Sequence, residues 1–147
     1  MTTTAIQTTQ VYRLYIKASP DEIWDAITKP EFTERYFYGA RIENTPDGHR
    51  SLGPDDDVWG EAEVTEFDPP RKLVHGWRSL YDPELAAEEE SRVTWEIEPQ
   101  DGGLCLLTVV HDQLEGAPKT AASVSGGWML VLSGLKTLLE TGQPLVG

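Results

Sequence analysis

The chain of 147 residues has the length of one ordinary domain, and 39% of its residues are hydrophobic, which is enough for a single core. Its 12 basic and 25 acidic residues give a formal net charge of −13, which repels phosphate backbones and anionic lipid, so we expect neither a nucleic-acid partner nor a membrane. The sequence shows no apolar run of 18 residues and no basic-then-apolar leader, and its single cysteine, Cys105, excludes an internal disulfide, so a reduced cytoplasmic protein is expected.

The N-terminal part predicts a strand followed by two helices. Residues 1–9 are polar and threonine-rich, so we expect a flexible N-terminus ahead of one domain over residues 10–147. From Val11 to Ala18 apolar and polar residues alternate, which predicts a strand. Residues 19–22 read Ser-Pro-Asp-Glu, a capping box with proline at the first helical position, and the helix it begins is predicted to stop at Pro30. A short second helix is predicted over residues 31–35.

The middle of the chain predicts strands joined by short turns. Residues 39–57 are expected to hold one strand near 41–44 and a loop in which His49 is exposed. Further strands are predicted over residues 58–67, 72–80, 92–98 and 104–112, with a rigid Pro-Pro turn at residues 68–71. Residues 82–90 carry acidic and no basic side chains, which is typical of a solvated loop. The last two strands should form a hairpin around residues 99–103.

The C-terminal part predicts a long helix. Apolar residues recur at helical spacing from about Thr120 to Thr141, and Gly142 and Pro144 end the pattern. One strand, two helices, a run of antiparallel strands and a terminal helix make an α+β fold. The apolar face of the terminal helix must lie against the sheet, and a curved sheet around a helix leaves a wedge of the kind that often forms a ligand cavity.

Four sequence blocks in order resemble a known superfamily. The first block resembles the opening of the START-like (SRPBCC, or Bet v 1-like) helix-grip superfamily, and its residues are Ile16, Ala18, Pro20, Ile23, Trp24, Ala26, Ile27 and Pro30. The blocks over residues 68–77, 107–114 and 127–142 are similar to the branch of that superfamily named for the activator of Hsp90 ATPase. The resemblance implies a β-α-α-β6-α chain, in which a curved antiparallel sheet wraps around a long C-terminal helix and an internal cavity. It leaves the activity open, because family members bind hydrophobic ligands, act as cyclases or assist a chaperone.

Two histidines are candidates for polar contacts in such a cavity. His75 shares strand parity with Trp77, and His111 shares it with Val109, so both histidines are expected on the concave face of the sheet. They are either ligand anchors or an acid–base pair in a dry pocket, or they are hydrogen-bonded core residues. We favour the core interpretation, since pocket walls are mostly apolar.

Three of the five tryptophans are candidates for the cavity wall. Trp77, Trp95 and Trp128 either fill a core or stack on a flat apolar ligand, and the sequence does not separate these alternatives. Gly126 and Gly127 lie inside the predicted helix, where glycine costs roughly 1 kcal/mol against alanine. Two explanations would offset this cost: the glycines allow the helix to approach the sheet closely, or they leave room for a ligand or a hinge.

Motifs of catalysis and metal binding are missing from the sequence. It contains no GxSxG elbow, no phosphate-binding glycine loop and no HExxH or CxxC spacing, so no catalytic residue, metal or cofactor is predicted. Cys105 falls in an apolar strand, where a thiol is usually an inert core residue.

The function predicted from the sequence is therefore non-catalytic binding of a small hydrophobic or aromatic molecule between sheet and terminal helix, by a monomer or a homodimer. The predicted ligand-binding residues are Trp77, Trp95, Val109 and Trp128 as apolar wall and His75 and His111 as polar contacts. One alternative is a cyclase- or hydrolase-type enzyme that uses the cavity histidines. The other is a co-factor whose partner is a chaperone of the Hsp90 type.

Overall fold

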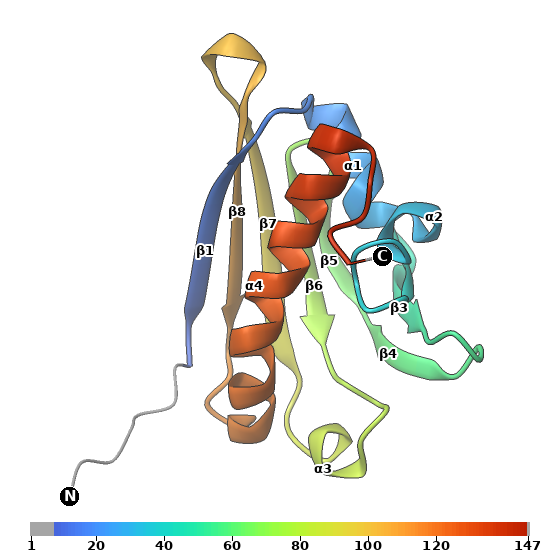
Figure 1. Cartoon of the computed structure of the whole chain (residues 1–147). Coiled ribbons are helices and arrows are strands. Elements are labelled where there is room, and N and C mark those ends of the chain that lie inside the picture. Colours follow the sequence, from blue (N-terminus) through green and yellow to red (C-terminus); the bar gives the residue numbers. More distant parts are fainter. Residues whose placement is uncertain (1–7, 147) are drawn as a thin grey trace, which may run out of the picture.

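The structure, a computed structural model, describes residues 8–146 (Figure 1). Of the predicted flexible N-terminus, residues 1–7 lie outside the described residues. The elements in chain order are β1 (Gln10–Ile16), α1 (Pro20–Thr28), α2 (Pro30–Thr33), β2 (Arg41–Thr45), β3 (Gly48–Leu52), β4 (Val58–Ala62), β5 (Val64–Asp68), β6 (Lys72–Trp77), α3 (Pro83–Ala86), β7 (Ser91–Pro99), the 3-10 turn η1 (Asp101–Gly103), β8 (Cys105–Asp112) and α4 (Pro118–Thr141).

Two antiparallel sheets together form the curved surface that faces α4. One has five strands in the order β1-β8-β7-β6-β5, and the other has three in the order β2-β3-β4. They continue into each other where β4 passes the end of β6, since Gly60 pairs with Ser79 and the Leu80 amide donates to the Trp59 carbonyl oxygen at 2.8 Å. Helix α4 lies along one face of the sheet, and the hairpin of β7 and β8 extends beyond its C-terminal end (Figure 1). The predicted α+β helix-grip fold is confirmed.

The strand predicted over residues 58–67 is divided in two. Strand β4 ends at Ala62 and β5 begins at Val64, and the pairing of β5 with β6 shifts register between Val64 and Glu66. Such an irregularity bends a strand and increases its twist. The described residues after α2 therefore form seven strands where the resemblance implied six, and the break is the point at which the small sheet turns away from the large one.

The exposed position expected for His49 is wrong. Residues 48–52 are not a loop but strand β3, which pairs with β2 on one side and β4 on the other. As the central strand of its sheet, β3 alternates buried and exposed side chains, and His49 is only 5% exposed. The acidic stretch 82–90 likewise contains the short helix α3, whose N-cap Asp82 accepts a hydrogen bond from the Glu84 amide.

The capping box predicted for the first helix is confirmed. The Ser19 hydroxyl accepts a hydrogen bond from the Glu22 amide at 3.2 Å, and the Glu22 carboxylate accepts one from the Ser19 amide at 3.0 Å. Both bonds satisfy amides that a helix start leaves without partners. The apolar face of α1 then buries Ile23, Trp24 and Ile27 in the core.

Helix α4 receives its N-terminal cap from another part of the chain. The carboxylate of Glu88, in the segment after α3, accepts hydrogen bonds from the amides of Lys119 and Thr120, each at 2.8 Å. At the other end Gly142 takes the left-handed conformation, with φ of 77°. By length and composition α4 is able to cross a membrane. It is instead a core helix, because Trp128 and the apolar residues on its face pack against the sheet.

Candidate functional site

A cavity of about 380 Å³ lies between α4, the small sheet and the segments that follow α2 and β6. This volume falls in the range of roughly 300–1,000 Å³ that is usual for small-molecule sites. The wall is built mainly from rings, and the six large aromatic side chains in it are Phe37, Tyr38, Trp59, Trp77, Tyr81 and Trp128. They come from five different parts of the chain, so the cavity exists only in the folded protein.

The rings on the side of α4 pack against one another. The centroid of Trp128 lies 5.7 Å from that of Trp77 and 6.0 Å from that of Phe37, in tilted and edge-on arrangements. Such arrangements are the favourable ones for aromatic pairs. These three rings therefore form one packed aromatic surface on this side of the cavity.

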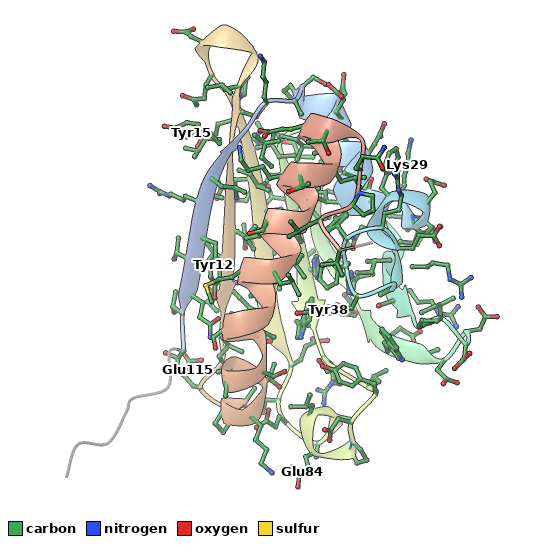
Figure 2. All side chains as sticks on the ribbon, in the orientation of Figure 1. Tyr12, Tyr15, Lys29, Tyr38, Glu84 and Glu115 are labelled. Carbon is green, nitrogen blue, oxygen red and sulfur yellow. The ribbon has the colours of Figure 1, made fainter. Side chains whose placement is uncertain are left out.

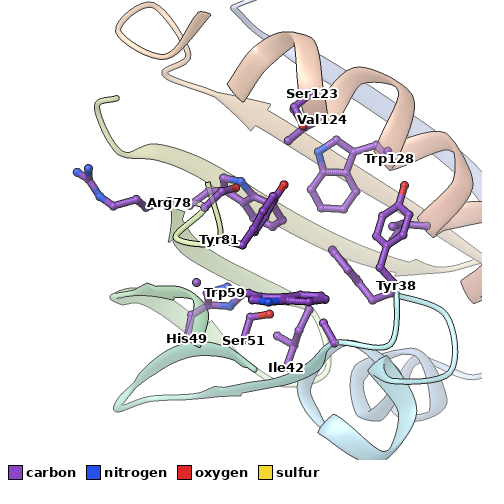
Figure 3. A pocket seen from close by; sticks show the side chains of 17 residues that line it. Tyr38, Ile42, His49, Ser51, Trp59, Arg78, Tyr81, Ser123, Val124 and Trp128 are labelled. Carbon is purple, nitrogen blue, oxygen red and sulfur yellow. The ribbon is translucent and has the colours of Figure 1, made fainter. Parts of the chain in front are cut away.

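Trp59 forms the facing wall. Figure 3 shows its ring lying beside Ser51 and His49, with Trp128 across the cavity. A Cβ atom at Gly53 would be only 2.2 Å from the Trp59 ring, so glycine is needed there for the ring to lie against the backbone. An edge-on contact with Tyr81, at 5.9 Å between centroids, fixes the other side of Trp59.

The structure brings two of the six predicted ligand-binding residues to the wall of this cavity, Trp77 and Trp128. His75 and Trp95 lie one layer behind, next to a second void of about 10 Å³. Val109 and His111 have no solvent exposure, and neither lines either of these two spaces.

His75 is held by two hydrogen bonds inside the protein. Its Nδ1 donates to the Gly76 carbonyl oxygen at 2.8 Å, and its Nε2 accepts from the Trp95 indole N–H at 3.1 Å. Burial lowers the pKa of His75 from 6.5 to about 4, although the bond to Gly76 acts in the opposite direction. The ring is therefore neutral at pH 7, and both of its nitrogens are in use.

His111 has an equivalent arrangement with the other buried tryptophan. Its Nδ1 accepts from the Trp128 indole N–H at 3.0 Å, and its Nε2 donates to the Ser91 hydroxyl at 2.8 Å. Burial, with a smaller contribution from His75, lowers the pKa of His111 to about 4. Each of these histidines thus supplies the acceptor that a buried tryptophan N–H requires.

Sequence reasoning missed four of the six large rings of the wall, Phe37, Tyr38, Trp59 and Tyr81, and it also missed His49. His49 lines the cavity, and its Nδ1 donates to the Asn44 side-chain oxygen at 2.7 Å. The ring stacks on His75 with 4.1 Å between centroids and 5° between planes. Burial, and next the neighbouring His75, lower the pKa of His49 well below 6.5. The signal in the sequence was the Asp47-Gly48 pair, which is typical of a tight hairpin turn that places His49 at the start of a strand.

The polar groups on the wall are few, and they carry no available charge. Arg78 is the only fully charged residue among those that line the cavity. Its guanidinium donates to the carbonyl oxygens of Ala86 and Glu88 at 2.9 and 2.7 Å, and Figure 3 shows it pointing away from the cavity. The buried Trp77 indole N–H has no hydrogen-bond partner among the described residues.

The two consecutive glycines of α4 have different surroundings. A Cβ atom at Gly127, which lines the cavity, would lie 3.4 Å from the Tyr38 hydroxyl oxygen, whereas one at Gly126 would meet nothing within 4 Å. Figure 2 places Tyr38 beside α4. Gly127 therefore leaves room for Tyr38 and for the cavity, and Gly126 faces open space.

Residues 8–146 contain no group of three histidine, cysteine, aspartate or glutamate side chains that lie close enough together to bind a metal ion. Cys105 is 1% exposed, and burial is the first cause that raises the pKa of its thiol. A protonated, buried thiol is a poor nucleophile.

Comparison with known proteins identifies relatives of this fold. The family model described as Activator of Hsp90 ATPase homolog 1-like protein matches residues 17–140. No protein among those with curated functions matches the chain significantly.

Solved structures show the same fold at low sequence identity. Protein MLL2253 from Mesorhizobium loti has 21% identity and a TM-score of 0.72, over 90% of this chain and 96% of that one. The Aha1 dimer from Colwellia psychrerythraea has 17% identity and a TM-score of 0.71, over 92% of this chain and 98% of that one. CalU16 from Micromonospora echinospora has 21% identity and a TM-score of 0.69, over 94% of this chain and 77% of that one.

Proposed function

The chain belongs to the Activator of Hsp90 ATPase homolog 1-like family, and we propose that it binds a small apolar or aromatic molecule in the cavity between its sheets and α4, without catalysis. The observation that carries the proposal is the cavity of about 380 Å³ with its six aromatic side chains. Atoms around an unfilled space lose dispersion contacts, so rings that served only to fill a core would be expected to close it.

The six residues predicted from the sequence take three roles in this proposal. Trp77 and Trp128 contact the ligand, since both line the cavity. Trp95 and Val109 support them from the layer behind, and the centroid of Trp95 lies 5.4 Å from that of Trp128. His75 and His111 hold the indole groups of Trp95 and Trp128 in place.

An acid–base role for His75 and His111 gains no support from these contacts. Every ring nitrogen of the two histidines is hydrogen-bonded to the protein, and both pKa values are about 4. A general base works best with a pKa near the working pH and a free lone pair directed at the substrate. We therefore propose binding rather than turnover.

The proposal is tested with the uncharged fluorophore N-phenyl-1-naphthylamine. We expect it to bind with micromolar affinity, near −8 kcal/mol, and to quench part of the tryptophan emission. Gly127→Leu puts a large side chain into the cavity and should abolish binding. Gly126→Leu is the matched control, because the same change one residue earlier faces open space and should leave binding intact.

Absence of binding in the parent protein, or equal loss in both glycine variants, would refute the proposal. The two variants also report on stability, since leucine is a better helix former than glycine and should not weaken α4. A loss of binding confined to Gly127→Leu therefore reflects the cavity and not the helix.

Membership of the family favours a second candidate, a co-factor of an Hsp90-type chaperone in the cytoplasm. The test is the ATPase rate of the host's Hsp90-type chaperone with and without the protein. Stimulation that persists in Gly127→Leu would assign the chaperone role to a surface separate from the cavity. No stimulation leaves ligand binding as the function.

A further inference from the structure

The orientation of His49 is fixed by a chain of hydrogen bonds that ends in the cavity wall. The Asn44 side-chain nitrogen donates to the Ile27 carbonyl oxygen at 2.8 Å, so the Asn44 oxygen is the atom that faces His49. That oxygen only accepts, so the proton of the neutral His49 ring must be on Nδ1. The other nitrogen, Nε2, therefore carries a lone pair that pairs with no described residue, and it keeps surface open to the cavity that His49 lines.

A molecule that fills the cavity removes this lone pair from solvent and must supply a donor in its place. His49 is 5% exposed, and the stacked His75 ring disfavours a positive charge beside it, so His49 stays a neutral acceptor. A carboxylate or a carbonyl group of a ligand would face this lone pair without pairing with it. Only a hydroxyl or an N–H group of the ligand satisfies it.

The charge of the wall restricts the ligand further. The lining residues include no aspartate or glutamate, and Arg78 is turned away into its bonds with the segment around α3. An ionised group in this cavity would have no counter-charge, and burying such a group is costly. The ligand that fits is uncharged.

A hydroxyl group meets both requirements, because it donates a hydrogen bond and carries no charge at pH 7, whereas an aliphatic amine is protonated and charged at that pH. The Trp77 indole N–H, which is buried with no partner among the described residues, has no surface open to the cavity and takes no part in this selection.

We propose that the molecule bound in this cavity is an uncharged aromatic alcohol or phenol, whose hydroxyl group donates a hydrogen bond to Nε2 of His49. The proposal rests on the proposed function, since it names the class of ligand for the same cavity. Aromatic rings of the wall hold the ring system of the ligand, and His49 selects its polar substituent.

The test compares 2-naphthol with 2-methoxynaphthalene, which has the same ring system but no donor. Both compete with N-phenyl-1-naphthylamine for the parent protein and for His49→Leu at pH 7. We expect the parent to bind 2-naphthol about five- to tenfold more tightly, and the variant to bind the two compounds within a factor of two. A positively charged probe, 1-naphthylmethylamine, should bind more weakly than 2-naphthol in both proteins.

Outcomes that overturn this inference differ from those that overturn ligand binding. Equal affinities for the two naphthalenes in the parent, an unchanged preference in His49→Leu, or tighter binding of the charged probe would overturn the role of His49, while binding itself would stand. Failure of the fluorophore and of all three probes would overturn the proposed function as well.

A second measurement uses only the parent protein, so it tests the proposal even if the His49→Leu variant does not fold. Nitrogen-15 NMR distinguishes the protonated and unprotonated nitrogens of each imidazole ring. Added 2-naphthol should shift the unprotonated nitrogen of His49 upfield as it accepts a hydrogen bond, and 2-methoxynaphthalene should not. A proton found on Nε2 of the free protein would contradict the proposal.

Discussion

Lowering the pH should destabilise the folded protein well before its carboxylates are protonated, because three buried histidines must remain neutral. The pKa values of His75 and His111 are about 4 in the folded protein, against 6.5 in an unfolded chain. Between these values the unfolded chain binds protons that the folded chain does not, so the free energy of unfolding falls as the pH falls from about 6.5 to about 4 and levels off below. His49 acts in the same direction.

The size of the effect follows from the two pKa values. At pH 5 each of His75 and His111 should reduce the free energy of unfolding by about 2 kcal/mol relative to pH 8. The total free energy of unfolding of a typical domain is only about 5–15 kcal/mol. Glu88 and Glu140, whose folded pKa values lie below the usual 4.5, lose their contributions only at lower pH. The histidines therefore dominate between pH 7 and pH 5.

Urea unfolding at half-unit steps from pH 8 to pH 5 measures this dependence. Near pH 5.2 the unfolded chain should bind about 0.9 proton more at His111 than the folded chain does. The substitution His111→Gln should therefore lower the slope of the free energy of unfolding against pH by about 1.2 kcal/mol per pH unit. The slope is informative even if the variant is less stable at every pH. A free energy of unfolding that is flat from pH 7 to pH 5, or a slope unchanged in His111→Gln, would refute the assignment of these rings as buried and neutral.

Three further predictions concern local structure. Ser19→Ala removes half of the capping box of α1 and should cost about 0.5–2 kcal/mol in the free energy of unfolding, whereas coincident urea midpoints would show that Ser19 does not cap the helix. Glu88→Ala removes the acceptor of two α4 amides and should cost about 1 kcal/mol in the same assay, and hydrogen exchange at Thr120 should rise; unchanged exchange would contradict this role. Cys105 should react slowly with a thiol reagent in the native protein and rapidly in urea, and fast native labelling would contradict its burial.

The parts of the fold that were predictable from sequence depend on local signals. The capping box at Ser19 and Glu22 lies within four residues, and the apolar spacing of α4 repeats over six turns, so each pattern specifies its own element. Strand parity correctly placed His75 and Trp77 on one β6 face toward α4. The start of α4 was less predictable, because its cap is Glu88, some thirty residues earlier in the chain.

The cavity itself depended on contacts that no local pattern contains. Trp77 and Trp95 are both inward-facing residues on neighbouring strands, so their pattern in the sequence does not show which of them lines a cavity. What separates them is the small sheet, whose Trp59 stands opposite Trp128 and leaves space in front of Trp77. His49 was missed for the same reason, since its burial requires β3 to pair on both sides.

The most direct test of ligand binding in this cavity uses the indole N–H signals of the five tryptophans. A proton–nitrogen NMR spectrum is recorded with and without saturating N-phenyl-1-naphthylamine. The signals of Trp59, Trp77 and Trp128 should shift, because these rings line the cavity. Trp24, which packs edge-on against Phe67 between α1 and the sheet, should not move. Shifts confined to those three rings would support a ligand held between sheet and helix, and no shift, or an equal shift at Trp24, would contradict it.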